Sequence, residues 1–387
     1  MRKIVLTILL SISILLNLNA QKILFDNTKS ETASNADWII DDNEPVPSPA
    51  QSGITSSTSE TFWQGALSSW GVEMVKRGFT VEILPYYHDI SYGNSSNSQD
   101  LSNYDVYVVC EPNNPFTSSE KTAILNFVQN GGGLFIISDH AGADRDGDGW
   151  DALEVWNDFF DDYNNPFGFT FDAESNVSKD PATNIANLPS DDILHGAAGN
   201  VDGIAFYNGA SISINKNANS TVKGIVYLDN YSNTGTIGIM VACSLYGQGR
   251  VVGVGDSSVP EDETAHDNSN TYPGWTQPFN AGNATGDDGV LITNATLWLA
   301  DQSNAVNKIK KNTFVEIYPN PADNFINFVS ETKISEIKIL NIIGKQMFVK
   351  EVNLKQVKID IRNLESGIYF IKIKTDHGKQ VSKLVIK

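Results

Sequence analysis

The sequence predicts an α/β protein: a mostly parallel sheet covered by helices, followed by a small all-β sandwich. Two observations predict this order. Near-continuous apolar runs alternate with helical patterns up to about residue 254, as in a parallel sheet that is buried on both faces. Beyond residue 313 apolar and polar residues alternate instead, as in short antiparallel strands. With 387 residues and 41% hydrophobic content, the chain is long enough for two cores.

Each element expected within residues 21–302 has a local signal. The helix at 62–77 has an amphipathic pattern, and the helix at 118–129 starts at a serine cap and ends at glycines. A further helix is expected at 151–160, after an acidic turn. The expected strands are apolar runs bounded by turn residues, at 23–26, 79–84, 104–110, 134–137, 236–242 and 249–254.

The first residues indicate the compartment. Arg2 and Lys3 precede an apolar run that ends near the small residue Ala20, which is the pattern of a secretory signal peptide. The run is too short to span a membrane, and no later stretch reaches the roughly 18 apolar residues that a span needs. We therefore expect a signal peptide at 1–20 and a secreted or cell-surface protein without a transmembrane segment.

The charge changes sharply along the chain. Residues 21–307 hold 10 Lys and Arg against 38 Asp and Glu, whereas residues 308–387 hold 15 against 8. A body this acidic repels phosphate backbones, so nucleic acid is not an expected partner. The change in charge and pattern predicts an α/β domain at 21–302, a linker at 303–313 and an all-β domain at 314–387.

The all-β domain carries a specific resemblance. Its motifs are Tyr-Pro-Asn-Pro-Ala at 318–322, Ile-Ile-Gly at 342–344, Leu-Glu-Ser-Gly-Ile-Tyr at 364–369 and Lys-Leu-Val-Ile-Lys at 383–387. In these motifs the domain resembles the type IX secretion (Por) C-terminal sorting domain of Bacteroidota. The resemblance implies that the type IX secretion machinery is a partner and that the protein is exported through the outer membrane.

Polar residues follow the carboxyl ends of several expected strands. In open α/β sheets ligands bind outside these ends, so the side chains there are candidates for a site. Aromatic residues in the loops suit stacking on sugar rings; the alternative is a small hydrophobic cluster under a long loop. The candidates for catalysis are Glu111, Asp139, His140, Asp256 and Ser257, and those for substrate binding are Asp26, Asn27, Tyr87 and Trp275.

The order of elements in the body is similar to the class I glutamine amidotransferase-like fold, in particular its trehalose-utilisation-like branch. The similarity rests on the glycines at 131–133 before a strand that ends at the reactive position, and on a late Gly-Arg-Val-Val strand followed by a polar turn. In that family the first position holds a cysteine nucleophile and the late strand brings a histidine. Here the sequence has residues 138–140, Ser-Asp-His, and 256–257, Asp-Ser, so thiol chemistry is not expected.

Several chemistries stay open at this edge. Asp139 and Asp256 with His140 could act as general acid and base, or could bind a metal that activates water. Ser138 or Ser257 could be a nucleophile with a histidine base, although neither lies in a Gly-x-Ser-x-Gly turn. In the structural alternative the aspartates only cap turns and support a structural ion.

The loop after the fourth expected strand has an oxygen ligand at every second position. Its aspartates and a glycine follow positions 1, 3, 5 and 6 of an EF-hand-like loop, which suits Ca²⁺, although position 12 is a valine. A structural calcium is therefore expected; the alternative is a solvated acidic turn. The expected ligands are Asp144, Asp146, Asp148, the carbonyl of Trp150 and Glu154.

These observations together predict a secreted hydrolase that acts on an extracellular polymer. Carbohydrate is the expected class, because the rim has several carboxylates and a histidine and the tail directs the chain to the cell surface. The alternative is a non-catalytic carbohydrate-binding or surface protein with the same fold.

Overall fold

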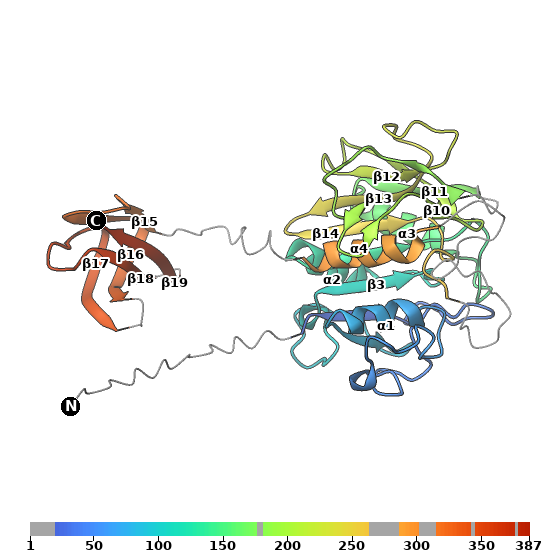
Figure 1. Cartoon of the computed structure of the whole chain (residues 1–387), viewed down its shortest axis with the longest axis horizontal. Coiled ribbons are helices and arrows are strands. Elements are labelled where there is room, and N and C mark those ends of the chain that lie inside the picture. Colours follow the sequence, from blue (N-terminus) through green and yellow to red (C-terminus); the bar gives the residue numbers. More distant parts are fainter. Residues whose placement is uncertain (1–19, 176–180, 263–285, 302–314, 342–344, 376–377) are drawn as a thin grey trace, which may run out of the picture. The chain divides into compact units, whose positions relative to one another are not determined.

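The structure is a computed structural model that describes residues 20–175, 181–262, 286–301, 315–341, 345–375 and 378–387. The chain divides into two units, Met1–Gln302 and Ser303–Lys387 (Figure 1). Residues 1–19 of the expected signal peptide, the expected linker and Trp275 lie outside the described residues. In the described ranges, no helix has the length and apolar character needed to cross a membrane.

Five parallel strands form one half of the sheet in the first unit. In spatial order they are β2 (Thr80–Leu84), β1 (Lys22–Asp26), β3 (Val106–Cys110), β4 (Gly133–Ile137) and β14 (Gly249–Val254). All residues of β3, β4 and β14 are buried. This burial on both faces explains their near-continuous apolar sequences.

The other half of the same sheet is antiparallel. Its strands are β13 (Ile239–Tyr246), β11 (Ala210–Ile214), β5 (Phe169–Ser175), β12 (Lys223–Tyr227) and β7 (Asn184–Ile185). Two-residue ribbons flank it, formed by β6 (Pro181–Ala182) with β10 (Ile204–Ala205) and by β8 (His195–Gly196) with β9 (Gly199–Asn200). The α/β class is confirmed, and the sheet is mixed.

Helices cover both faces of the parallel half (Figure 1). They are α1 (Ser68–Lys76) and α4 (Asp288–Ala300) on one face, and α2 (Ser118–Gln129) and α3 (Ala152–Asp162) on the other, with short 3₁₀ turns η1 (Gln51–Gly53) and η2 (Leu101–Asn103). On the first face Trp70 packs its ring 5.2 Å from that of Phe25 and 4.9 Å from that of Phe135. On the other, Lys121 of α2 pairs with Asp158 of α3 at 2.6 Å.

The predicted helix at 62–77 begins only at Ser68. The preceding residues pair instead with the segment that follows β1: Leu67 N–H donates to the carbonyl of Ile39 at 2.9 Å. Gly65 lies so close to this segment that a Cβ atom there would be 2.3 Å from the same carbonyl oxygen. Tertiary backbone contacts therefore replace the first turns of the helix.

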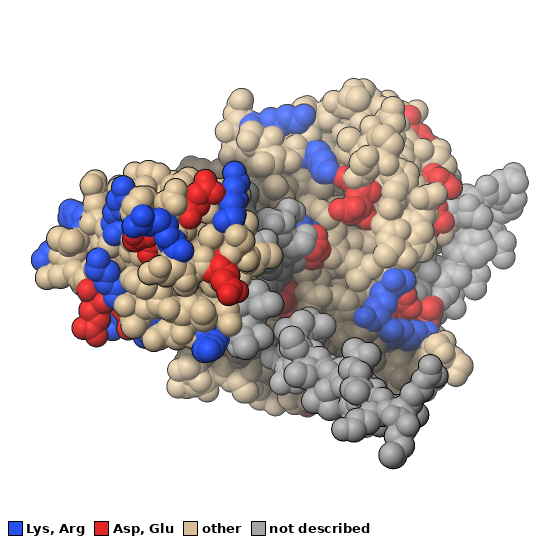
Figure 2. Space-filling model, turned by 60° about the vertical axis from the view of Figure 1, so that its left-hand side comes forward, with Lys and Arg blue, Asp and Glu red and all other residues tan. Residues whose placement is uncertain are grey.

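The second unit is an all-β domain, as predicted. Its strands are β15 (Val315–Tyr318), β16 (Phe325–Asn341), β17 (Gln346–Asp360), β18 (Gly367–Thr375) and β19 (Gly378–Ile386). All pairings are antiparallel, in the order β15-β16-β18-β19, with β17 also paired to β16. Figure 2 shows many Lys and Arg side chains on this smaller unit, in agreement with its excess of basic residues.

Candidate active site at the edge of the parallel strands

Neighbouring strands bring polar residues together at the carboxyl edge of the sheet. β3 and β4 end side by side at Cys110 and Ile137. The ladder continues one residue further, since Glu111 N–H donates to the carbonyl of Ile137 at 3.0 Å and Ser138 N–H donates to that of Val254 at 2.9 Å. The residues after β3, β4 and β14 therefore start from one edge, as the strand-end rule predicts.

A cavity of 420 Å³ opens at this edge. Three of the predicted catalytic residues line it, namely Asp139, His140 and Ser257. Ser258, which follows the same strand end as Ser257, also lines it. The sequence did not indicate the remaining lining residues, which are Asn35, Trp38, Arg145, Tyr207 and Asn208. The lining is mostly polar, with two aromatic rings.

Arg145 is the most connected side chain of this cavity. Its Nε donates to Glu111 Oε1 at 2.5 Å, and its two Nη atoms donate to Asp139 Oδ2 at 2.8 Å and to Asn35 Oδ1 at 3.2 Å. Its backbone N–H donates to Asn113 Oδ1 at 2.7 Å. The loop after β1, the loop after β3 and the turn after β4 thus all meet at one guanidinium group.

Asp139 is held in a setting that favours its protonated form. Burial raises the pKa of its carboxyl group well above the usual range, and the charges of Glu111 and Asp256 raise it further. The Arg145 guanidinium acts in the opposite direction. A buried carboxyl group with an elevated pKa in a cavity wall can donate a proton near neutral pH.

His140 has one ring nitrogen committed to the backbone. Its Nδ1 lies 3.0 Å from the carbonyl oxygen of Ala141. Because a carbonyl oxygen can only accept, Nδ1 carries the proton in the neutral ring and Nε2 is left as an acceptor. Nε2 lies 4.0 Å from Asp139 Oδ2, and 27% of the side chain is exposed.

The other two predicted catalytic carboxylates lie outside the cavity lining. Glu111 is fully buried with a φ of +53°, in the left-handed region, and it contacts the cavity only through Arg145. Asp256 is also fully buried, and its two oxygens accept hydrogen bonds from the backbone N–H groups of Tyr207 and Ser258. Burial raises the pKa of Asp256 as well. In this geometry Asp256 shapes the turn that carries Ser257.

Asp26, a predicted substrate-binding residue, lies in a buried acid pair instead. Asp26 and Glu31 are 1% and 0% exposed. Burial raises the pKa of both, and the charge of Asp26 raises that of Glu31 further, well above its usual range. Tyr107 OH lies against Asp26, and burial also raises the pKa of that hydroxyl. A single proton shared between the two carboxyl groups best satisfies this pair.

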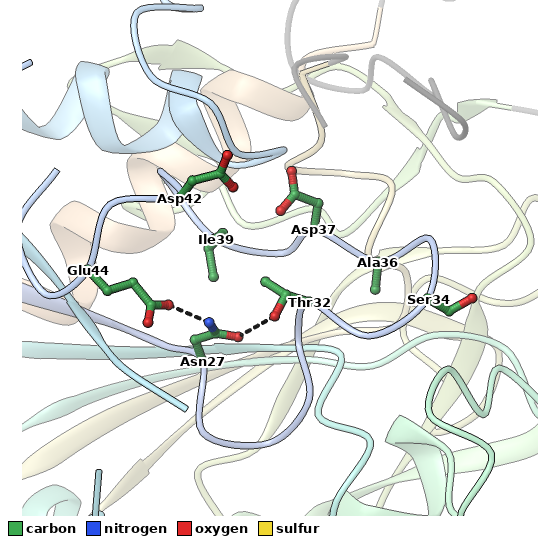
Figure 3. Close-up of a pocket in the computed structure, with 8 residues that line it drawn as sticks. All are labelled: Asn27, Thr32, Ser34, Ala36, Asp37, Ile39, Asp42 and Glu44. Carbon is green, nitrogen blue, oxygen red and sulfur yellow. Dashed lines mark hydrogen bonds between the residues drawn. The ribbon is translucent and has the colours of Figure 1, made fainter. Parts of the chain in front are cut away.

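Asn27 lines a different cavity, of 280 Å³, within the segment that follows β1 (Figure 3). Its amide donates to Glu44 Oε1 and accepts from Thr32 Oγ1. Burial raises the pKa of Glu44. Tyr87 is 80% exposed, with its ring 4.8 Å from that of His88, and it lines neither of these cavities.

Two of the open chemistries find no support in this geometry. Ser138 Oγ donates to the carbonyl of Asp139, and no hydrogen bond in the described residues joins Ser138 or Ser257 to a histidine. A nucleophilic serine needs such a base. Across the described ranges, the group of three acidic or histidine ligands that is close enough for a metal ion lies in the aspartate loop and does not include Asp139, His140 or Asp256.

The aspartate loop, residues 144–150, gathers three of its predicted ligands. One carboxylate oxygen from each of Asp144, Asp146 and Asp148 lies within 4.8 Å of the others. Gly147 and Gly149 have φ of +76° and +96°, and their N–H groups donate to Asp144. These positive angles allow the loop to wrap around its carboxylates.

The remaining predicted ligands of this loop are placed less favourably. Trp150 is the last residue of the loop, and its N–H donates to Asp148 Oδ1 at 2.8 Å. Glu154 lies in the first turn of α3, where its N–H donates to the helix cap Asp151 at 2.9 Å. Its side chain is exposed and does not belong to the group of three.

Sequence signals for the additional cavity residues were weak. Arg145 is the single basic residue in an acidic run at 144–151, and a cation in such a setting is a sign of an ion pair. Asn35 and Trp38 lie in a segment without regular secondary structure. No periodic pattern could indicate which of its side chains face inward.

One comparison with known proteins identifies the second unit. Residues 316–387 match the secretion system C-terminal sorting domain. The predicted type IX sorting domain is therefore confirmed, and with it a secreted or cell-surface location and an interaction with the secretion machinery. No curated protein matches the chain.

Several solved structures are similar to a large part of this chain. The chain is 14% identical to the mmIFT52 N-terminal domain, with 72% of this chain and 97% of that chain covered and a TM-score of 0.42. The chain is 13% identical to a ThuA-like protein from Parabacteroides merdae, with 73% of this chain and 90% of that chain covered and a TM-score of 0.35. It is 10% identical to Agd3, a carbohydrate deacetylase, with 87% of this chain and 38% of that chain covered and a TM-score of 0.35. At these values the similarities say nothing about activity.

Proposed function

We propose that the first unit is a secreted hydrolase that acts on an extracellular polymer of the carbohydrate class. The observation that carries this proposal is the pairing of two proton-transfer groups at the wall of the 420 Å³ cavity. Asp139 has an elevated pKa, and His140 presents Nε2 as an acceptor 4.0 Å from Asp139 Oδ2.

The two groups can divide the work of hydrolysis. Protonated Asp139 donates its proton to the leaving oxygen as the bond between that oxygen and carbon breaks. His140 Nε2 accepts a proton from the water molecule whose oxygen attacks the same carbon. The water proton on His140 and the vacant site on Asp139 then exchange with solvent, which returns both groups to their starting state.

The cavity lining suits a ligand rich in hydroxyl groups. Asn35, Asn208, Ser257 and Ser258 supply amide and hydroxyl groups for hydrogen bonds, and Trp38 adds an aromatic ring. Arg145 is already paired with two carboxylates, and the described lining residues include no other Lys or Arg for an anionic substrate. A neutral sugar fits this combination best.

A panel of purified polysaccharides tests the proposal, with product formation as the readout. The native chain should cleave at least one polymer, and His140→Asn should lower the rate roughly 100-fold or more. His195→Asn is the matched control, because His195 is an exposed histidine bonded to Asn200 and lies outside the cavity lining. Cleavage that survives His140→Asn at the native rate would remove His140 from the reaction.

One observation favours the non-catalytic alternative. The Asp139 side chain is only 5% exposed and is ion-paired with Arg145, as expected for a residue that merely shapes a binding cavity. A carbohydrate-binding protein would bind a polymer of the panel and release no product. Equal binding by the native chain and His140→Asn, with no product from either, would select this alternative.

We also propose that the aspartate loop holds a structural calcium ion. The three clustered carboxylates and the two glycines at positive φ support this assignment. A bound divalent cation would offset the mutual repulsion of Asp144, Asp146 and Asp148, which the described contacts leave without a cation of their own.

Calcium should therefore raise the thermal stability of the chain. At 100 times its dissociation constant, a ligand that binds only the folded state adds about 2.7 kcal/mol to the free energy of unfolding. Scanning calorimetry with calcium and with excess chelator measures the difference. The double variant Asp146→Asn, Asp148→Asn should show no response to calcium; an identical melting curve of the native chain in both buffers would contradict the assignment.

A further inference from the structure

Arg145 joins two parts of the molecule that have separate proposed roles. It belongs to the aspartate loop by sequence, between Asp144 and Asp146, yet its guanidinium group lies in the cavity wall. All three of its nitrogen positions donate to protein oxygens, on Glu111, Asp139 and Asn35. The side chain is only 18% exposed.

We propose that Arg145 is a positioning residue that fixes Asp139 for proton transfer and couples Asp139 to the aspartate loop. The proposal rests on the proposed hydrolase function for its catalytic meaning. In this proposal Arg145 acts in the reaction by holding Asp139 and does not contact the substrate.

The hydrogen-bond geometry assigns separate tasks to the two oxygens of Asp139. Oδ2 accepts from an Nη atom of Arg145 at 2.8 Å. A proton on the carboxyl group therefore resides on Oδ1, because Oδ2 faces a donor. The planar, forked guanidinium binds Glu111 at the same time and so fixes the orientation of the carboxyl group, which a single ammonium cannot do.

The loop side of Arg145 is also tied to the edge of the sheet. Its backbone N–H donates to Asn113 Oδ1, and the adjacent Asn114 amide donates to Asp146 Oδ2 at 2.5 Å and to Asp148 Oδ2 at 3.2 Å. Both asparagines follow β3 directly after Glu111 and Pro112. A shift of the loop therefore moves the guanidinium group relative to Asp139.

The charged surroundings of Asp139 give the proposal a measurable consequence. Burial raises the pKa of its carboxyl group most, and the charges of Glu111 and Asp256 raise it further, whereas Arg145 and a hydrogen bond from the backbone N–H of His140 lower it. His140 Nε2 lies 4.0 Å from Asp139 Oδ2. Burial raises the pKa of the Cys110 thiol, and the charges of Glu111 and Asp139 contribute to that rise. Loss of the Arg145 guanidinium group removes a positive charge that lowers the pKa of Asp139. The charges of Glu111 and Asp256, which raise this pKa, then act without that opposing charge.

Carbon-13 NMR titration of the Asp139 carboxyl group tests the proposal without any substrate. The resonance is assigned by its loss in Asp139→Asn. We expect the pKa of Asp139 to rise from the native chain to Arg145→Lys and again to Arg145→Met, since lysine can donate to one carboxylate but cannot bridge two. Arg77→Met is the matched control: Arg77 directly follows α1 and pairs with Glu73 of that helix at 2.7 Å, and its loss should leave the Asp139 titration unchanged.

Each outcome of the titration either supports or overturns the positioning role of Arg145. An unchanged Asp139 titration in a folded Arg145→Met chain overturns the proposal; if that variant does not melt cooperatively, Arg145→Lys decides in the same way. If the titration shifts as expected while no polymer is cleaved, the hydrolase function fails and the positioning role stands. With a cleaved polymer, Arg145→Lys should lower kcat roughly ten-fold at a similar KM; a change confined to KM would indicate substrate contact and overturn the role.

Discussion

Asp139→Asn should abolish polymer cleavage while the chain stays folded. The asparagine keeps an oxygen that can accept from Arg145 but cannot donate an acidic proton to a leaving group. We expect the rate to fall roughly 10²- to 10⁴-fold, as for the loss of a general acid. Product release from the polymer cleaved by the native chain measures the effect, and calorimetry checks that the melting temperature stays within a few degrees.

Asp191→Asn is the matched control for this prediction. The Asp191 side chain is also 5% exposed and also pairs with a cation, Lys223, but it lies outside both cavities. Its loss tests the general effect of removing a buried carboxylate from an ion pair. If Asp139→Asn cleaves the polymer as fast as Asp191→Asn, Asp139 is not the acid.

Glu31→Gln should stabilise the chain at neutral and alkaline pH. Lys29 N–H donates to Glu31 Oε2 at 2.7 Å, and glutamine can accept this bond while its amide group donates to Asp26. The variant thereby removes a titrating group that the fold holds in a fully buried position. A gain of about 1 kcal/mol would raise the melting temperature by roughly 2–4 °C for a domain of this size.

The raised pKa values predict how the stability difference between Glu31→Gln and the native chain changes with pH. The pKa values of Asp26 and Glu31 are both raised in the folded state. The pH window of interest runs from the ordinary carboxyl range near pH 4 up to these raised pKa values. Within this window the native state binds more protons than the unfolded state. The free energy of unfolding therefore falls as the pH rises through this window. The advantage of Glu31→Gln should be absent below about pH 4 and should grow with pH.

Calorimetry of both chains from pH 4 to pH 9 measures this trend. Glu73→Gln provides the control, because Glu73 lies on the surface of α1 in an ion pair with Arg77. Its effect should be small at every pH. A stability difference between Glu31→Gln and the native chain that shrinks as the pH rises would show that the pair does not hold an extra proton.

The sequence predicts the parallel half of the sheet well because burial on both faces leaves a strong signal. The strand at Leu134–Ile137 and its partners are apolar without interruption, and short turns bound them. The sequence predicts little of the antiparallel half. β5, β11 and β12 pair with register shifts at Ala210/Ile212 and Gly224/Val226, and such irregular strands do not keep the period of two that identifies a strand.

The candidate site was predictable in part for a related reason. The strand-end rule identifies Asp139 and His140, because β4 is a regular element and the next residues are fixed by it. Trp38 and Glu31 could not be found in this way, since they lie in a long irregular segment whose backbone pairs with residues 64–67. The sequence does not indicate the role of Arg145, because its neighbours suggest a metal loop while its side chain contacts Glu111 and Asn35, which are distant in the chain.

The most direct measurement is to map where a carbohydrate binds on the inactive Asp139→Asn chain. Amide chemical shifts of a labelled sample are followed by NMR as oligosaccharide fragments of the cleaved polymer are added. The site described above predicts that the largest shifts occur at Trp38, His140, Tyr207 and Asn208, which line the 420 Å³ cavity. Shifts concentrated around Asn27 and Glu44, or no saturable shifts anywhere, would contradict it.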